Sequence, residues 1–154
     1  MVLQKAIRAA APSVADALEA DKSLRSPVPL SERQARGKDF FSRIYQQHTD
    51  RILQSMNASS GGDLGEFAVN CIYGDLVAET SILDAKETGM LEFVACIALM
   101  AAPQAKGHMY GAHNLGNTGS EIKAAVASVR VLANDLGAHW SDEGMDFFTK
   151  ADKW

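Results

Sequence analysis

The stretch KGHMYGAHNLGNTGSEI, residues 106–122, gives the clearest indication of how this 154-residue chain folds. Thr118 and Glu121 have the spacing of a capping box, in which the two side chains satisfy free backbone N–H groups at the start of a helix. Gly107 and Gly111 flank His108 and leave room for a second helix or a ligand to approach the backbone. The stretch therefore predicts a corner between two helices, and this corner presents His108.

The segments on either side of this corner have the apolar spacing of helices. The upstream helix is expected to begin at Asp84, as its N-cap, and to end or kink at Pro103. The downstream helix is expected to stop at Gly137. The predicted core positions are Leu91, Val94, Ala95, Ala98 and Ala101 in the first helix, and Ile122, Ala125, Val126, Val129 and Ala133 in the second.

The N-terminal part is also predicted to be helical. A first helical stretch covers 2–20 with an interruption at Pro12, and the segment KSLRSPVPL, 22–30, reads as an extended linker because of its prolines. Ser31 is the expected start of a long helix over 32–56. The predicted core stripe of this helix consists of Phe40, Ile44, Ile52, Leu53 and Met56.

Two more helices complete the prediction. The run NASSGG, 57–62, should break the long helix, and Asp63 is the expected cap of a helix over 64–79. Ser141 is the expected start of a last short helix. The apolar side chains expected to pack are Phe67, Cys71, Ile72 and Val77 in the former helix, and Phe147 and Phe148 in the latter.

No segment alternates apolar and polar residues as a strand does, so the sequence predicts an all-α fold of about seven helices. We expect a single domain, 31–154, preceded by an N-terminal helix and linker, 1–30. A net charge of −4 with no basic cluster argues against nucleic acid binding. No uninterrupted apolar run is long enough to span a membrane.

The cysteines and the N-terminus bear on the compartment. Cys71 and Cys96 form neither a zinc-binding pattern nor a disulfide framework, which favours a reducing, cytoplasmic location. The first residues are basic, rich in alanine and free of acids before Asp16, so a mitochondrial transit peptide is the alternative to an ordinary first helix.

His108 is the leading candidate for chemistry. An imidazole can accept and donate protons near neutral pH, whereas the ordinary interpretation is a histidine that hydrogen-bonds a backbone carbonyl at a helix junction. His113 is about 140° away on a helix, so the two form a poor metal site and no metal is expected. Glu92 and Glu87 are the acids considered as its partners, although the spacing of Glu92 favours a solvent-facing position over a partly buried one beside a histidine. Tyr73 and Tyr110 could donate hydroxyl hydrogen bonds or simply pack as aromatic side chains.

This part of the chain resembles the carboxymuconolactone decarboxylase family, which shares the alkyl hydroperoxidase D-like helical fold. The resemblance covers about 65–136, roughly half of the chain. The positions that carry it are Leu83, Asp84, Leu91 and Ala95 in the upstream helix, and His108, Gly111, Ala112, Asn114, Gly116, Thr118, Glu121 and Ile122 around the corner.

The resemblance implies a trimeric or hexameric homo-oligomer that acts on a small molecule without a cofactor. The implied reaction is decarboxylation, proton transfer or isomerisation of a lactone or a β-keto acid, a lyase or isomerase activity, with His108 as general acid or base. Glu92, and after it Glu87, would orient or relay protons. The expected substrate-binding residues are Tyr110, Tyr73, Asn114 and Cys96.

The chain departs from the family pattern at three places. No two cysteines three residues apart stand shortly before His108, so the thiol peroxidase branch is not expected. Gly89 and Thr88 stand at the ungapped positions of the family's acid and arginine. The alternatives are therefore a non-catalytic ligand-binding or structural oligomer on the same fold and, less favoured, a redox protein that uses Cys96 or Cys71.

Overall fold

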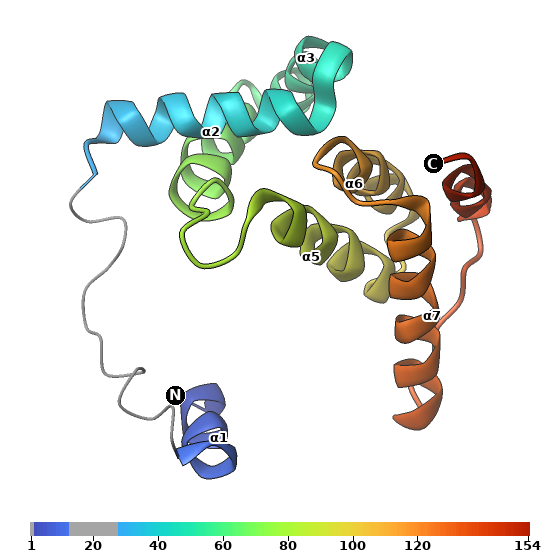
Figure 1. Cartoon of the computed structure of the whole chain (residues 1–154). Helices are drawn as coiled ribbons and strands as arrows, with labels where there is room; N and C mark the ends of the chain where they lie inside the picture. Colours follow the sequence, from blue (N-terminus) through green and yellow to red (C-terminus); the bar gives the residue numbers. More distant parts are fainter. Residues whose placement is uncertain (1, 13–27) are drawn as a thin grey trace.

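The computed structural model describes residues 2–12 and 28–154, and over these residues the chain is all-α. The prediction of about seven helices is confirmed, because the described residues form seven α-helices, together with two 3₁₀ segments and one π-helix (Figure 1). The elements are α1 (Val2–Ala10), α2 (Leu30–Tyr45), η3 (Gln46–His48), α3 (Thr49–Ser60), α4 (Asp63–Glu66), η4 (Phe67–Val77), α5 (Ala85–Ala98), α6 (Ala102–Asn114), α7 (Gly119–Asp135) and η5 (Asp146–Lys153).

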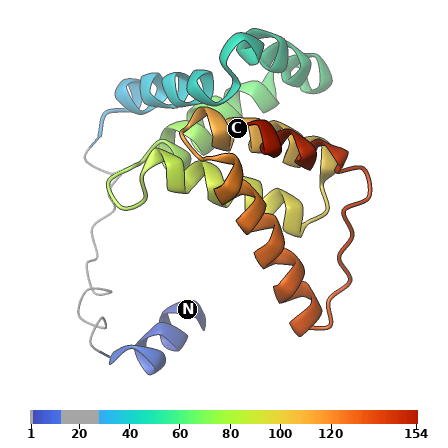
Figure 2. The same ribbon diagram turned by 45° about the vertical axis from the view of Figure 1, so that its right-hand side comes forward.

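The arrangement brings α6 to the centre of the fold. Helix α6 packs against α2, α5 and α7, while α2 also crosses η4 and η5 lies along α7 (Figures 1 and 2). Because of this packing, His108 in α6 is within reach of several elements at once.

No helix in the described part of the chain combines the length and the apolar character needed to cross a bilayer.

At the N-terminus, α1 ends at Ala10, just before Pro12, as the sequence predicted. The rest of the predicted helix over 2–20, and the linker over 22–30 as far as residue 27, lie outside the described residues.

The prediction of one long helix over 32–56 is wrong, because two α-helices joined by η3 occupy this region. The backbone of Gln46 has φ 46° and ψ −124°, a conformation that L-residues rarely adopt and that no α-helix can continue. Ser31 does not cap α2 either, since the helix begins one residue earlier, at Leu30. Phe40 and Ile44 are buried as predicted.

The break predicted over 57–62 is confirmed only at its glycines, since α3 continues to Ser60 and Gly61 ends it in the left-handed conformation at φ 68°. Asp63 is not the cap of the following helix but its first residue, and Gly62 precedes it. The segment predicted as a plain helix over 64–79 contains the π-helix η4, whose wider turn changes the buried face. The side chains buried there are those of Ala68, Tyr73 and Val77, while Phe67, Cys71 and Ile72 are exposed.

The predicted core face of α5 is mostly wrong. Leu91, Ala95 and Ala98 are exposed, whereas Phe93 and Ile97 are completely buried between α6 and α7. The helix is apolar on nearly every side, so its periodicity does not identify the inner face. Pro103 does not kink α5, which already ends at Ala98, but lies in the first turn of α6.

The core has two parts. One lies beneath α2 and η4, and the other is enclosed by α5, α6, α7 and η5. The first contains Phe40, Phe41, Ile44, Tyr73, Val77 and Ala78; the second contains Phe93, Ile97, Ala105, Met109, Ala112, Ile122, Val126, Val129, Met145 and Ala151.

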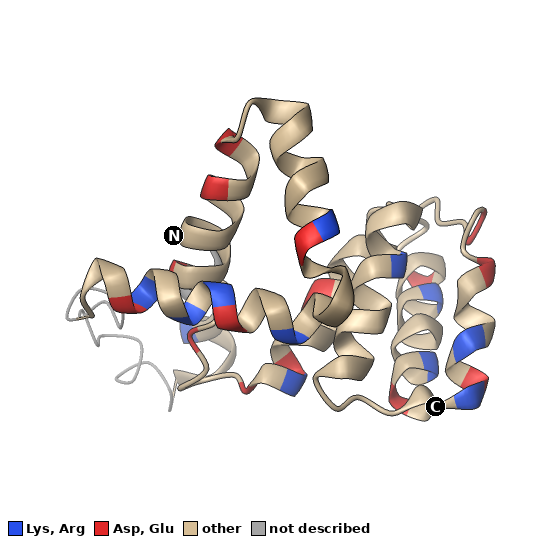
Figure 3. Cartoon of the chain, turned by 90° about the horizontal axis from the view of Figure 1, so that it is seen from above, with Lys and Arg blue, Asp and Glu red and all other residues tan. Residues whose placement is uncertain are grey.

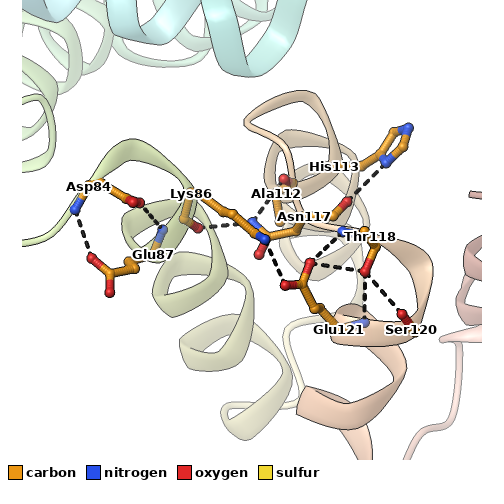
Figure 4. Close-up of polar contacts among 9 residues, drawn as sticks. All are labelled: Asp84, Lys86, Glu87, Ala112, His113, Asn117, Thr118, Ser120 and Glu121. Atoms are coloured by element: carbon orange, nitrogen blue, oxygen red, sulfur yellow. Dashed lines mark hydrogen bonds and ion pairs between the residues drawn. The ribbon is translucent and has the colours of Figure 1, made fainter.

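The corner predicted between α6 and α7 is confirmed (Figure 4), but it does not present His108, which lies with Gly107 and Gly111 inside α6. The Thr118 hydroxyl accepts the N–H of Glu121, and the Glu121 carboxylate accepts the N–H of Thr118 at 2.8 Å. The buried Asn117 side chain donates to the carbonyls of Lys86 and Ala112 and so ties the corner to the start of α5.

At the C-terminal end, α7 stops two residues before Gly137, which has φ 62°, as predicted. The last short helix does not begin at Ser141 but at Asp146, and it is a 3₁₀ helix. Phe147 and Phe148 pack against the core, as expected.

Candidate functional site

His108 and Glu92 face each other between α6 and α5. His108 Nδ1 lies 3.7 Å from Glu92 Oε2, and each side chain is less than one-fifth exposed. At that distance the two atoms attract each other when the imidazole is protonated, but they are too far apart for a hydrogen bond. Both atoms are fully buried and have no hydrogen-bond partner among the described residues. The solvent-facing alternative for Glu92 is thereby excluded, and Glu92 lies beside His108, as the first of its two predicted partners.

Helix α2 reaches this pair because Gly111 has no side chain. A Cβ atom at Gly111 would lie 2.7 Å from Cγ2 of Ile44 in α2, so only glycine allows the two helices to pack at this distance. The Asn114 side chain then donates a hydrogen bond of 2.8 Å to the carbonyl of Ile44. The room expected beside His108 is therefore taken by α2.

Two tyrosines approach the histidine from the α2 side. The hydroxyl groups of Tyr45 and Tyr73 share a hydrogen bond of 3.1 Å. The rings of Tyr45 and His108 meet edge to face, with centroids 6.3 Å apart. Tyr45 thus links the buried Tyr73 of η4 to the histidine of α6.

Burial determines the electrostatics of these groups. Desolvation is the main cause that raises the pKa of Tyr45 and, far more strongly, that of Tyr73, and the negative charge of Glu92 raises both further. The pKa of the Cys96 thiol is raised by the same two causes. These three groups therefore keep their protons at neutral pH, and the two tyrosines can act as hydroxyl donors.

We call Tyr45, Tyr73, Glu92, Cys96 and His108 the core site. The sequence selects four of these five residues, and the structure places the five on four elements, α2, η4, α5 and α6, that meet at one place. The sequence does not single out Tyr45, because there it reads as one more position of a long helix. Only the packing of α2 on η4 and α6 gives it a role.

Glu87, the second predicted acid, is not at the core site. Its carboxylate accepts the backbone N–H of Asp84 at 2.9 Å in a capping box that starts α5 (Figure 4). Gly89 lies where a Cβ atom would be 2.7 Å from Leu115 and 3.3 Å from the backbone of α6, so the helices leave no room for an acid there. Glu92, one turn further along α5, is the acid that reaches His108.

Tyr110 and His113 turn toward the C-terminus rather than toward His108. The His113 ring stacks on Trp154, with centroids 4.1 Å apart and an interplanar angle of 7°. The Tyr110 ring meets the same indole edge to face at 5.0 Å. Within the described ranges, no group of three histidine, cysteine or acidic side chains could hold a metal ion.

A cleft of about 580 Å³ opens beside the core site. It lies between α6 and the α2–η3–α3 connection, and it includes Tyr45 and Gly107, the residue before His108. Tyr110 and Asn114, both predicted to bind substrate, line this cleft. The full lining is Ile44, Tyr45, Gln46, Gln47, His48, Arg51, Pro103, Lys106, Gly107, Tyr110 and Asn114.

Comparison with known proteins gives two relatives with the same name. The chain is 33% identical over 108 residues to Peroxisomal protein 2 of Schizosaccharomyces pombe, a match that covers 70% of this chain and 50% of that protein. It is 28% identical over 104 residues to Peroxisomal protein 2 of Saccharomyces cerevisiae, which covers 68% of this chain and 36% of that protein. No family model and no solved structure matches. The chain thus spans half or less of the length of these two relatives.

Proposed function

We propose that this chain is a cofactor-free small-molecule enzyme in which His108 is the general acid or base. The reaction would be decarboxylation or proton transfer on a lactone or β-keto acid, in line with the resemblance of residues 65–136 to carboxymuconolactone decarboxylases. The observation that carries this proposal is the buried His108–Glu92 pair, whose facing atoms have no hydrogen-bond partner among the described residues. Such atoms are costly to bury, which favours a role beyond folding.

The residues of the core site would divide the work as follows. In decarboxylation, the bond between the carboxylate and the α-carbon breaks, CO₂ leaves, and the electron pair moves onto the neighbouring carbonyl oxygen as an enolate. His108 would then deliver a proton to the α-carbon. Tyr45, which retains its hydroxyl proton, would donate a hydrogen bond to the enolate oxygen.

Glu92 would act as a positioning residue. A carboxylate 3.7 Å from Nδ1 would hold the imidazole in its orientation toward the substrate. Tyr73 would hold Tyr45 through the hydroxyl–hydroxyl hydrogen bond.

The test is a screen for CO₂ release or product formation with small lactones and β-keto acids, followed by the His108→Ala variant. Loss of turnover with unchanged circular dichroism supports the proposal. His139→Ala is the matched control, because His139 is exposed and lies outside the cleft and the core site. If His108→Ala turned over substrate as fast as the parent protein, the proposed role of His108 would be refuted.

The alternative is an oligomeric binding protein without catalysis. It predicts that His108→Ala changes ligand affinity or assembly and that no substrate is turned over. A thiol-based redox function is less favoured, because the raised pKa of Cys96 lowers the fraction of reactive thiolate. Function that persisted in a double variant with serine at Cys71 and Cys96 would exclude it.

We also propose a homo-oligomer, trimeric or hexameric, and a peroxisomal location. Support for association comes from large apolar side chains that are exposed on α4, η4, α5 and the segments that follow η4 and α5. Support for the location comes from the names of the two relatives, and it replaces the cytoplasmic expectation as our proposal. Light scattering of the purified protein and fluorescence microscopy of a tagged chain test these points. The exposed apolar side chains of these helical and connecting regions are Leu64, Phe67, Ile72, Leu76, Ile82, Leu83, Leu91 and Leu99.

A further inference from the structure

The cleft beside the core site has a one-sided charge. His48, Arg51 and Lys106 line it, and no aspartate or glutamate among the described residues does. Elsewhere on the described helices, acidic and basic positions are interspersed (Figure 3). A concave surface whose charged side chains are all basic attracts anions, because the fields of several like charges add up where water is partly excluded.

The two permanent cations of the cleft have no carboxylate partner among the described residues. Neither Arg51 nor Lys106 takes part in an ion pair within the described part of the chain. Other surface cations of the fold do, for example Lys86 with Glu121 at 2.6 Å and Lys123 with Asp152 at 2.9 Å. Arg51 and Lys106 therefore have their hydrogen-bond donors available for a ligand.

The rest of the lining suits the body of an organic molecule. Ile44, Pro103 and the rings of Tyr45 and Tyr110 provide apolar walls, and side-chain amides complete the rim. The volume of about 580 Å³ is in the range of ligand sites of small molecules. The rim also contains Gln46, whose positive φ is a conformation that proteins retain mainly where function requires it.

The cleft communicates with the core site through one residue. Tyr45 forms part of the cleft wall, contacts the His108 ring and bonds to the Tyr73 hydroxyl. A ligand seated in the cleft would thus have a charged end near α3 and a second end against Tyr45.

We propose that this cleft binds an organic anion, with its carboxylate or phosphate group held by Arg51 and Lys106 and its apolar part directed toward Tyr45. This inference rests on the proposed function in one respect, since it makes the bound anion the substrate that meets His108. It assigns the recognition of the anion to α3 and α6. Thr88 in α5 stands at the position where the resembling family has an arginine, so that position cannot supply the cation.

The test uses three probes with one ring system: 2-naphthoate, 2-naphthyl phosphate and the neutral 2-naphthamide. Binding is measured by calorimetry at low salt with the full chain. We expect at least one anion to bind about tenfold more tightly than the amide, because hydrogen bonds between two charged groups are stronger than those to a neutral amide. The preferred anion distinguishes a carboxylate from a phosphate site. Equal affinity for all three probes, or no binding of either anion, would overturn the proposal.

The variant Arg51→Gln/Lys106→Gln should weaken the preferred anion about tenfold and leave the amide unchanged. The matched control is Lys38→Gln/Lys150→Gln, which removes the same charge from exposed positions outside the cleft. An equal loss in both double variants would mean that net charge, not the cleft, attracts the anion, and it would overturn the assignment.

The two proposals fail in different ways. His108→Ala should leave binding of the anionic probe within about twofold of the parent protein, because the cleft cations remain in place. Anion binding in a protein without any turnover refutes the proposed reaction and supports the cleft. Turnover that depends on His108 but has the same KM in Arg51→Gln/Lys106→Gln refutes the cleft and supports the reaction.

Discussion

The corner between α6 and α7 should depend on one buried amide. Asn117 is 4% exposed, and its Nδ2 donates to the carbonyls of Lys86 and Ala112 at 2.9 and 3.0 Å. Replacement by alanine removes both hydrogen bonds and leaves a small space between α5 and the corner. Because the Ala112 carbonyl also accepts the backbone N–H of Asn117, one of the two acceptors keeps a partner in the variant.

The expected loss follows from these contacts. Each hydrogen bond contributes about 1 kcal/mol net, and the carbonyl of Lys86 loses its side-chain partner, so Asn117→Ala should lower the free energy of unfolding by about 2–3 kcal/mol. For a chain of this length, that corresponds to a decrease in Tm of about 4–10 °C. Asn117→Asp should cost more, because an ionised carboxylate has no proton to donate to the two carbonyls.

Urea unfolding followed by circular dichroism measures this difference. With a slope of about 1–3 kcal/mol per molar urea, the midpoint should fall by roughly 0.7–3 M. Asn134→Ala is the matched control, because Asn134 is exposed near the end of α7, and its effect should stay within about 0.5 kcal/mol. If Asn117→Ala and Asn134→Ala unfolded at the same urea concentration, the Asn117 amide would not stabilise the corner and the reasoning would be refuted.

Three further predictions concern packing and ionisation. Gly111→Ala places a Cβ atom 2.7 Å from an isoleucine of α2 and should destabilise the fold by about 1–3 kcal/mol in thermal unfolding. Gly107→Ala, with its nearest neighbour at 3.9 Å, should be tolerated, and equal effects of the two variants would contradict the packing argument. The hydrogen bond from Lys86, followed by those from the corner threonine, lowers the pKa of Glu121 to about 2. The ionised Glu121 carboxylate therefore stabilises the fold fully above the ordinary pKa of the carboxyl, 4.5, and this stabilisation is lost as the pH falls toward 2. An NMR titration should show this pKa, and it should be higher in Lys86→Met. Burial raises the pKa of Tyr73, so the unfolded chain loses this proton first and stability declines as the pH rises above about 10. Absorbance at 295 nm should therefore show no Tyr73 phenolate before the protein unfolds, and a transition near pH 10 that vanished in Tyr73→Phe without loss of structure would refute this.

Local signals in the sequence predicted the ends of several elements correctly. The capping boxes at Asp84 and Thr118 and the left-handed glycines at 61 and 137 act through residues next to them in the chain, so their effect does not depend on the rest of the fold. The all-α class followed from the same kind of evidence.

The faces of the helices could not be predicted equally well. Helix α5 is apolar around most of its circumference, and only its contacts with α6 and α7 bury Phe93 and Ile97 rather than Leu91 and Ala95. The π-helical turn of η4 shifted its buried face onto Tyr73, which no regular helical spacing would have predicted together with Val77 and Ala68.

For the candidate site too, local features were predicted from the sequence, and the contacts between helices were not. The sequence by itself determined that His108 follows an apolar helix and that a capped corner starts the next one, because spacing and capping are local properties; it placed His108 in that corner, whereas the histidine lies inside α6. Only the tertiary structure decided that Glu92, and not Glu87, meets this histidine, that Tyr45 joins them, and that cations from α3 and α6 line one cleft beside them. These contacts depend on how closely α2, α5 and α6 pack, which is set by the steric fit of side chains far apart in the chain.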